Sequence, residues 1–306
     1  MTTRSQTAET CISITSDFSG STGDPAPSLR AAAEAGFTHV MWCHHWNDDF
    51  LYGREELVYL KALFRDFGLS LADIHGSQGV EKCWHSPEEY CRKAGVELVA
   101  NRIEMLGELG GDGTVMMHVP NFNTVDTDET RAATRLHFDA VCRSLDELMP
   151  RLDAANCAIA IENMFYDTWE LIDELLSRYP ANRLGICYDS GHANANDNKR
   201  IESLARHKDR LIALHLNDND GTGDQHKPPY CGTVDWDRLS QIIATSSYKR
   251  PLSFEIVITN TPFRVEGLTP PQQPYEARLA FAKDAYERCA RFAETVASAE
   301  ASGKSS

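Results

Sequence analysis

The amino-acid sequence predicts a single-domain (β/α)8 TIM barrel, an α/β fold in which parallel strands alternate with helices. Three observations favour this fold class. Short apolar runs alternate with helical patterns along almost the whole chain. Eight such units occupy roughly 280 residues, the usual size of this fold. The runs are almost continuously apolar, which is typical of parallel strands that are buried on both faces.

The predicted strands are short runs bounded by polar or glycine-containing segments. Runs of this length suit buried strands better than core helices. The first covers residues 11–17 (CISITSD). The other seven end near Trp42 (THVMW), His75 (LSLADIH), His118 (TVMMH), Glu162 (CAIAIE), Asp189 (LGICYD), His215 (LIALH) and Glu255 (PLSFE).

The predicted helices fill the segments between these runs. The first begins at Pro27 and ends at Gly36, because glycine adopts the left-handed conformation that closes a helix. The others are expected at residues 54–67, 87–109, 129–154, 168–177, 199–206, 236–246 and 275–296. Asp128, Glu129 and Asp235 fall at helix starts, where negative charge is favourable. We therefore expect an N-terminal tail at 1–10, one catalytic barrel at 11–298 and a disordered tail at 299–306.

The composition of the 306-residue chain limits the classes of function. A formal net charge of −15 disfavours a broad nucleic-acid surface, because such surfaces are rich in Lys and Arg. The sequence has neither a long apolar run nor a secretion signal, so we expect a cytoplasmic protein that spans no membrane. The nine cysteines include no Cys-x-x-Cys pair, which favours reduced thiols over disulfides or a thiolate metal site.

Acids and imidazoles end most of the predicted strands. Because all strand C-termini of a parallel barrel lie on one rim, these side chains should converge on one pocket. The strand-end residues are His75, His118, Glu162, Asp189, His215 and Glu255, and His192, Asp224 and His226 follow just above the rim. One strand-end histidine alone is usually a packed residue, but nine such groups favour a metal site. Oxygen and nitrogen ligands suit Zn²⁺, Mn²⁺, Co²⁺, Fe²⁺ or Mg²⁺, and the sequence does not choose among them.

The motifs around these residues resemble those of the xylose isomerase-like TIM barrels, over about residues 10–296. This family includes sugar isomerases and epimerases, inosose dehydratases and the endonuclease IV group. The matching motifs are Ile161-Glu162-Asn163, Tyr188-Asp189-Ser190-Gly191-His192, His215-Leu216-Asn217-Asp218, Asp224-Gln225-His226, Gly232-Thr233-Val234-Asp235-Trp236 and Phe254-Glu255. Because the family uses one site for several chemistries, the resemblance predicts the fold and the metal site more specifically than the reaction.

The resemblance implies roles for individual residues. It implies Glu162, Asp189, His215 and Glu255 as ligands of one shared metal ion. In the endonuclease group, two further zinc ions would be held by the remaining set of His75, His118, His192, Asp224 and His226. In the epimerases the metal chelates neighbouring oxygens of a ketose, two glutamates exchange protons on opposite faces, and His192 would contact the substrate. One to three metal ions are therefore expected.

Three classes of function follow. The first is a metal-dependent carbohydrate isomerase or epimerase, or a dehydratase or lyase, in which the catalytic residues Glu162 and Glu255 act as base and acid. The second is an endonuclease IV-like zinc phosphodiesterase acting on abasic DNA, and the third is a metal- or sugar-binding barrel without turnover. The sequence leaves the oligomeric state open, a homo-oligomer included.

The charge of the predicted rim loops separates the first two classes, because DNA binding needs Lys and Arg. Residues 44–50 contain Asp48 and Asp49 but no Lys or Arg, and residues 121–129 contain Asp126, Asp128 and Glu129, again without Lys or Arg. Residues 217–229 contain Asp218, Asp220 and Asp224 against Lys227 alone. We therefore expect a small neutral carbohydrate as the substrate and consider nucleic acid disfavoured.

Other residues near the rim are weaker candidates for substrate binding. His44 and His45 could bond to hydroxyl groups and Trp46 could stack on a sugar, although a packed aromatic loop would have the same sequence. Lys82, Trp84 and His85 are candidates for a lid, or for an ordinary solvated loop. Arg264 could contact a substrate oxygen. Asn163 and Asn217 are candidates for orienting the ligands.

Overall fold

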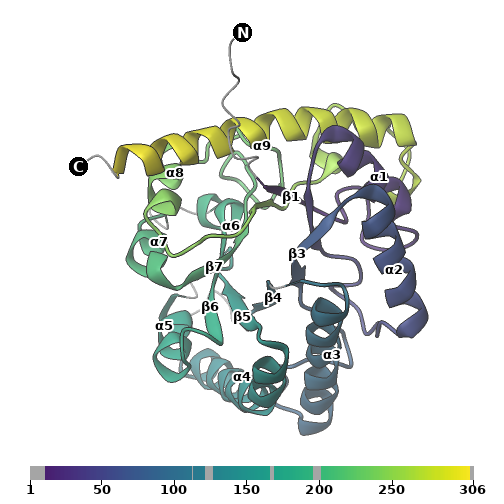
Figure 1. Ribbon diagram of the computed structural model, residues 1–306. Helices are drawn as coiled ribbons and strands as arrows, with labels where there is room; N and C mark the ends of the chain where they lie inside the picture. Colours follow the sequence, from purple (N-terminus) through teal and green to yellow (C-terminus); the bar gives the residue numbers. More distant parts are fainter. Residues whose placement is uncertain (1–10, 112, 121–126, 166–168, 196–200, 304–306) are drawn as a thin grey trace.

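The computed structural model describes residues 11–111, 113–120, 127–165, 169–195 and 201–303. The expected N-terminal tail at 1–10, Asp126 of the rim, the expected helix starts at Thr168 and Lys199, and the last residues of the chain lie outside these ranges. The described residues form a ring of strands surrounded by helices (Figure 1). The predicted (β/α)8 barrel is confirmed.

Eight parallel strands form the barrel. They pair in the order β7-β6-β5-β4-β3-β2-β1-β8. The ring closes between β7 and β8 through a parallel bridge from Leu216 to Phe254, just past the end of β7. The strands are β1 Ile12–Thr15, β2 His39–Trp42, β3 Ser70–His75, β4 Thr114–His118, β5 Ala158–Glu162, β6 Leu184–Asp189, β7 Leu211–His215 and β8 Leu252–Phe254.

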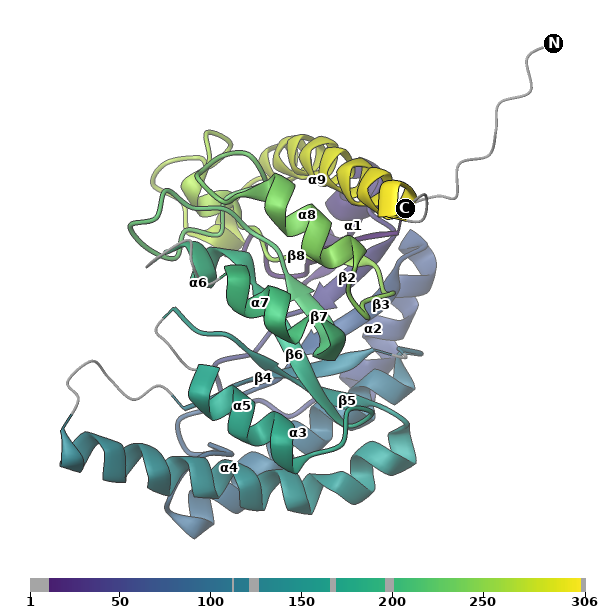
Figure 2. The ribbon, with the colours of Figure 1, turned by 90° about the vertical axis from the view of Figure 1, so that its left-hand side faces the viewer.

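The helices lie outside the ring, with α9 on one side and α3 and α4 on the opposite side (Figures 1 and 2). Gly36 closes α1 with a φ of 113°, in the left-handed region, as the sequence predicts. The Asp235 side chain caps α8 by accepting a hydrogen bond from the Arg238 amide. The helices are α1 Ala26–Ala35, α2 Arg54–Phe67, α3 Glu89–Glu108, α4 Asp128–Ala155, α5 Trp169–Arg178, α6 Ser190–Asn194, α7 Ile201–His207, α8 Trp236–Ala244 and α9 Tyr275–Gly303.

Two helical features differ from the sequence-based prediction. The short helix α6, directly after β6, was not predicted; the Asp189 side chain caps it by accepting from the His192 amide. Helix α9 continues to Gly303, past the predicted end at Val296, so residues 299–303 are helical rather than a disordered tail. Its buried face includes Phe292 and Val296, and nothing in the following sequence breaks the helix before Gly303.

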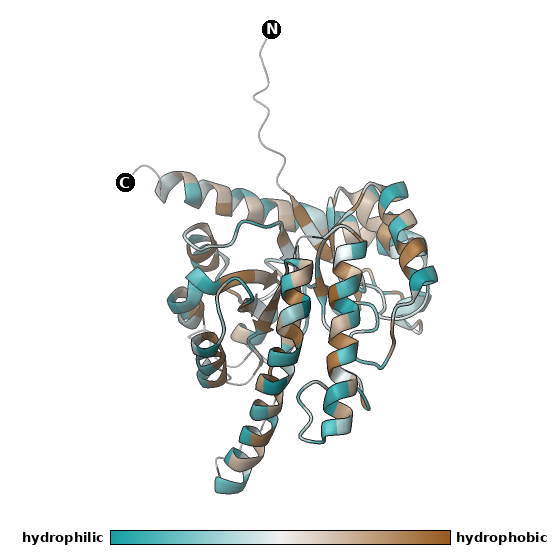
Figure 3. Ribbon diagram, turned by 60° about the horizontal axis from the view of Figure 1, so that its bottom comes forward, coloured by the Kyte–Doolittle hydropathy of each residue, from teal (hydrophilic) through white to brown (hydrophobic). Residues whose placement is uncertain are grey.

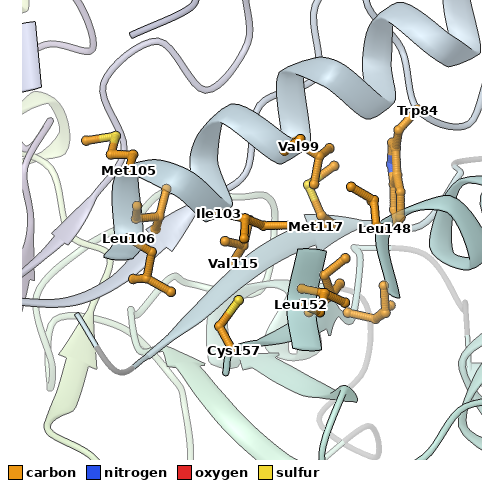
Figure 4. Close-up of a cluster of buried hydrophobic side chains, with 14 of the residues drawn as sticks. Trp84, Val99, Ile103, Met105, Leu106, Val115, Met117, Leu148, Leu152 and Cys157 are labelled. Carbon is orange, nitrogen blue, oxygen red and sulfur yellow. The ribbon is translucent and has the colours of Figure 1, made fainter. Parts of the chain in front are cut away.

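The hydrophobic core lies mainly between the strands and the helices, and the helices turn their polar residues outward (Figure 3). In one part of it, Trp84, from the segment before α3, and Val99 of α3 meet Met117 of β4 and Leu148 of α4 (Figure 4). Burying this apolar area is the main force that holds the helices on the barrel. No helix in the described ranges is long and apolar enough to cross a bilayer.

The centre of the barrel contains a buried layer of Ala, Cys and Met side chains below the strand ends. Met116, Ala160, Cys187 and Ala213 form a separate buried cluster there. Each precedes a strand-end residue by two positions, so the two sets point to the same inner face. This layer fills the barrel interior, so the polar strand-end side chains lie above it, at the open end of the barrel.

Candidate metal centre

Four strand-end side chains meet at the C-terminal end of the barrel. Glu162 ends β5, Asp189 ends β6, His215 ends β7, and Glu255 follows β8 directly. One ligand atom from each lies within 4.8 Å of those from the other three, and all four residues are buried. Residues far apart in the sequence therefore form one compact set of oxygen and nitrogen donors, as expected for parallel strands whose ends share a rim.

His215 lies at the centre of this set. Its Nδ1 is 2.6 Å from Glu162 Oε1 and 2.8 Å from Glu255 Oε2. Even so, both ring nitrogens of His215 and Oε1 of Glu162 are buried without a hydrogen-bond partner of good geometry among the described residues. Buried polar atoms are normally satisfied. Atoms that converge this closely without bonding to one another have the arrangement of ligands around a shared cation, so the residues fit a divalent metal.

Asp189 is held in place by its neighbours on β5 and β7. Its Oδ2 accepts a hydrogen bond of 2.8 Å from Asn217 Nδ2, and its Oδ1 accepts one of 2.6 Å from the His192 amide. Asn163 bonds to the Asp189 backbone on both sides, donating to its carbonyl and accepting from its amide at 2.9 Å. Both asparagines suggested by the sequence as orienting residues therefore contact this carboxylate or its backbone.

The electrostatics of the four residues are those of a crowded anionic site. Burial raises the pKa of Asp189 to about 7, and the charge of His192 opposes this shift. Burial also raises the pKa of Glu255, but the nearby charge of His215 outweighs burial and brings the value to about 2. The pKa of Glu162 falls well below its usual range for a similar reason. Buried carboxylates this close together are stabilised only by positive charge, which a divalent cation supplies.

His75 and His118 lie beside the four-residue set. The His118 Nε2 atom is 2.9 Å from Glu162 Oε2, and its ring centroid is 5.0 Å from that of His75. The His75 Nδ1 atom contacts the Gly76 carbonyl at 2.9 Å, and burial lowers the pKa of this ring to about 3. His75, His118 and Glu162 therefore form a second group whose ligand atoms lie within 4.8 Å of one another.

His192, Asp224 and His226 form a third group of the same compactness. The Asp224 carboxylate lies 2.9 Å from His226 Nε2 and 3.5 Å from His192 Nε2. Burial opposes protonation of His226, but Asp224 and the charge of Glu255 raise its pKa to about 9. All nine residues singled out at the strand ends therefore belong to one of the three groups.

The loop that carries Asp224 and His226 is fastened by the buried carboxylate of Asp218. Its oxygens accept hydrogen bonds from the Gly232 amide at 2.9 Å, the Val234 amide at 3.1 Å and Trp236 Nε1 at 3.0 Å. Asp218 is fully buried, so counting it among the surface charges of the rim was wrong.

Asp17, two residues after the end of β1, is an acidic residue at the rim that the sequence analysis missed. Burial raises its pKa to about 6, and the charge of Glu255 adds to the shift. The Thr15 hydroxyl donates a hydrogen bond to it. Its sequence signal was the same as for the other strands, since the first apolar run also ends in an acid.

The three aromatic residues after β2 have different surroundings. His44 is buried, stacks on Trp42 and lies 3.1 Å from the Ser16 hydroxyl through its Nδ1. His45 pairs with Asp48 at 2.6 Å. Only Trp46 reaches the centre, with ring centroids 4.8 Å from His75 and 5.8 Å from His118. The packed-loop alternative therefore describes His44, whereas Trp46 is positioned to contact a substrate.

The remaining candidates do not form a lid in the structure. Trp84 is fully buried in the core between α3 and α4, because the segment before α3 turns inward (Figure 4). The amide of Lys82 donates to Asp49 at 2.9 Å, which ties this segment to the loop after β2. Arg264 is exposed in the loop after β8, and no described hydrogen bond or ion pair joins its side chain to the four candidate ligands.

Comparison with known proteins agrees with the fold and the motifs. The chain is 33% identical over 250 residues to y4fM of Sinorhizobium fredii, an uncharacterized protein, covering 74% of this chain and 79% of y4fM. A D-tagatose 3-epimerase-like protein shares the fold with a TM-score of 0.67 at 19% identity, over 93% of this chain and 98% of its own. L-ribulose 3-epimerase also shares the fold, with a TM-score of 0.68 at 16% identity, over 93% of this chain and 95% of the epimerase chain. Since residues 29–285 also match the family model, the chain belongs to the xylose isomerase-like TIM barrel family.

Proposed function

We propose that this protein is a divalent-metal-dependent carbohydrate isomerase or epimerase that acts on a small sugar or keto-sugar. Glu162, Asp189, His215 and Glu255 would hold one ion of Mn²⁺, Zn²⁺, Co²⁺, Mg²⁺ or Fe²⁺. The observation that carries the proposal is the convergence of three buried carboxylates on His215, whose nitrogens have no hydrogen-bond partner among the described residues. A dehydratase or lyase that starts with the same proton abstraction would use the same groups.

The chain supplies two groups for proton transfer. When bound, the ion would polarise a substrate carbonyl and make the adjacent C–H more acidic. Glu162 and Glu255 project from opposite ends of the segment β5-β6-β7-β8, so a substrate carbon between them would meet one carboxylate on each face. His118 lies 2.9 Å from Glu162 Oε2 and helps to keep that carboxylate ionised and ready to accept a proton. Glu255 would return a proton on the other face.

The rim supports a neutral substrate. Asp48 and Asp49 in the loop after β2 bond to protein groups, and Asp220 after β7 is near Lys227 at 3.7 Å. Even without the buried Asp218, acidic residues outnumber Lys and Arg in the described parts of these loops. Phosphate groups need a positive surface, whereas aromatic faces such as that of Trp46 suit the apolar face of a sugar ring. A small carbohydrate, with His192 as a further contact, therefore fits better than DNA.

A zinc-dependent phosphodiesterase is the second candidate. The observation that favours it is the presence of two further ligand groups, His75 with His118 and Glu162, and His192 with Asp224 and His226. Three ions in these groups would activate water and stabilise the charge of a phosphodiester.

Substitution of the two glutamates tests the first proposal. Glu162→Gln and Glu255→Gln should each lower kcat by about 10²- to 10⁴-fold, while ketose binding persists. The readout is deuterium wash-in from solvent across ketoses, inososes and keto-glycosides. Because both residues are also ligands, the metal content of each variant is measured in parallel, and Glu104→Gln, an exposed acid of α3, is the control. Wash-in that persists in both variants would remove the proposed acid and base.

The metal stoichiometry separates the two candidates. One tightly held ion per chain, with turnover of free ketoses and none of abasic DNA, would support the epimerase. Three zinc ions per chain with strand cleavage would support the phosphodiesterase. Purified, active protein that contains no metal would contradict both.

A further inference from the structure

Arg102 of α3 is fully buried, yet it forms no ion pair with a carboxylate in the described part of the chain. An unpaired charge in the interior is unfavourable unless several dipoles compensate it. Burial accordingly lowers the pKa of this guanidinium to about 10. The family match and the metal centre give no reason for a charged residue here.

The Nη2 atom of the guanidinium bonds to oxygens of two loops at the C-terminal end of the barrel. Its Nη1 donates to Asn101 Oδ1 of the same helix at 2.7 Å, and its Nε has no partner among the described residues. Its Nη2 donates to the carbonyls of Phe50 at 3.0 Å and His45 at 3.3 Å, both in the loop after β2. The same nitrogen donates to the Ser77 hydroxyl at 3.1 Å, in the loop after β3. Its Cζ lies 4.6 Å from the Tyr52 ring centroid, which adds a cation–π contact. Arg102 therefore joins the loops after β2 and β3 from below.

His45, the residue directly before Trp46, accepts hydrogen bonds through its carbonyl. His45 has a φ of 59°, in the left-handed region, which is uncommon for a residue with a side chain. The Ser77 hydroxyl also donates to the His45 carbonyl, and the Gln78 amide donates to the Trp46 carbonyl at 2.9 Å. Bonds on both carbonyls fix the direction of the chain at this turn, and with it the direction of the Trp46 ring.

We propose that Arg102 is a positioning residue that fixes Trp46 against His75 and His118 as a wall of the substrate pocket. The proposal rests on the proposed sugar-binding function for its kinetic consequence, but its structural consequence is independent of substrate. Lys is a poor replacement, because an ammonium lacks the planar fork that reaches several carbonyls at once. Loss of Arg102 should therefore release Trp46 and weaken substrate binding, with little effect on the proton-transfer groups.

The first test needs no substrate. The quenching of Trp46 fluorescence by acrylamide is obtained as the difference between each protein and the same protein carrying Trp46→Phe. Arg102→Met should raise the quenching constant of Trp46 at least about twofold, and Arg102→Lys should have an intermediate effect. The control is Arg92→Met, since Arg92 is also buried on α3 but pairs with Glu89 and Glu147. Quenching that is unchanged in both Arg102 variants, or that rises equally in Arg92→Met, would overturn the proposal.

The second test is a double-mutant cycle with the substrate found by wash-in. Arg102→Met should raise KM about tenfold and change kcat by less than about threefold, whereas in the Trp46→Ala background it should change KM less than about twofold. An equal rise of KM in both backgrounds would overturn the proposal, since Arg102 would then act independently of Trp46. If the wild type turns over no sugar, the proposed function fails, and the quenching test still decides the role of Arg102. Arg102→Lys replaces Arg102→Met should the latter not fold.

Discussion

The side-chain amide of Asn217 donates a 2.8 Å hydrogen bond to Oδ2 of Asp189, across the pair β6 and β7. Oδ1 of the same carboxylate accepts from the His192 amide. Both oxygens of Asp189 are therefore oriented by donors, while its candidate ligand atom remains within 4.8 Å of those of the other three residues. Such outer hydrogen bonds hold a ligand in its binding geometry and reduce the entropy lost when a metal binds.

Asn217→Ala should therefore weaken metal binding by about 10- to 100-fold, because Asp189 loses one of its two orienting donors. The dissociation constant is measured by competition with a chromogenic chelator at fixed pH. Asn182→Ala, at an exposed position between α5 and β6, is the control and should bind metal as the wild type does. Equal affinities of the Asn217 variant and the wild type would contradict an orienting role.

Asp218→Ala should destabilise the protein by about 2–4 kcal/mol, since hydrogen bonds to a buried carboxylate are among the stronger ones. Four donors would lose an acceptor: the Asn219, Gly232 and Val234 amides and Trp236 Nε1. Urea unfolding gives the stability, and hydrogen exchange should show faster exchange in residues 218–236. The exposed Asp220, 3.7 Å from Lys227, provides the comparison: Asp220→Asn should leave the stability almost unchanged, because water screens an exposed ion pair. Similar losses in the two variants would argue against the carboxylate as the fastening group.

His44 should make the stability of the fold depend on pH. Burial lowers its pKa from 6.5 to about 3, so the unfolded chain binds a proton that the folded chain excludes. The stabilisation from this site is complete above pH 6.5 and is lost as the pH falls towards 3. Between pH 7.5 and 5, the wild type should lose about 2 kcal/mol through His44 that a His44→Asn variant does not lose. Urea unfolding of both proteins at the two pH values measures the difference, and parallel pH dependences would rule out this assignment.

Trp84 and Trp46 should give opposite phenotypes. Trp84 is fully buried between α3 and α4, so Trp84→Ala should lower the free energy of unfolding by about 3–5 kcal/mol and leave KM unchanged at temperatures where the variant is folded. Trp46 is only partly buried and lies against His75 and His118, so Trp46→Ala should raise KM with a smaller loss of stability. Denaturant unfolding and steady-state kinetics on both variants test this. A rise in KM for Trp84→Ala would contradict this prediction and would indicate that Trp84 lines the substrate pocket.

The regular elements could be predicted because their signals are local. Helix α2 begins after Gly53 and ends before Gly68, which takes a left-handed φ of 68°, and its apolar residues repeat at helical spacing. The strand ends were visible because most of the apolar runs stop at an acid or a histidine. Helix α6 could not be predicted in this way, since it is five residues long and depends on the Asp189 side chain as its cap. A helix this short has little propensity of its own.

The errors concern residues whose environment depends on distant parts of the chain. Trp84 stands among polar residues in the sequence, but α3 passes so close that a Cβ on Gly95 would lie 2.2 Å from the Trp84 amide nitrogen, and Leu148 of α4 packs nearby. Asp218 follows a strand in a glycine-containing loop, where an acid is usually solvated, yet donors from residues 232–236 surround it. Sequence periodicity carries no information on such pairings, because burial depends on which segments meet after folding.

For this protein, the sequence by itself determined the alternation of strands and helices and the chemical types at the strand ends, since both depend on short-range patterning and on the common direction of parallel strands. Only the tertiary structure decided that Glu162, Glu255 and His215 approach within hydrogen-bonding distance, that Asn217 orients Asp189, and that Arg102 lies beneath the loop of Trp46. These relationships depend on the closure of the barrel and on side-chain packing. Both are set by long-range contacts that bring together residues far apart in the chain.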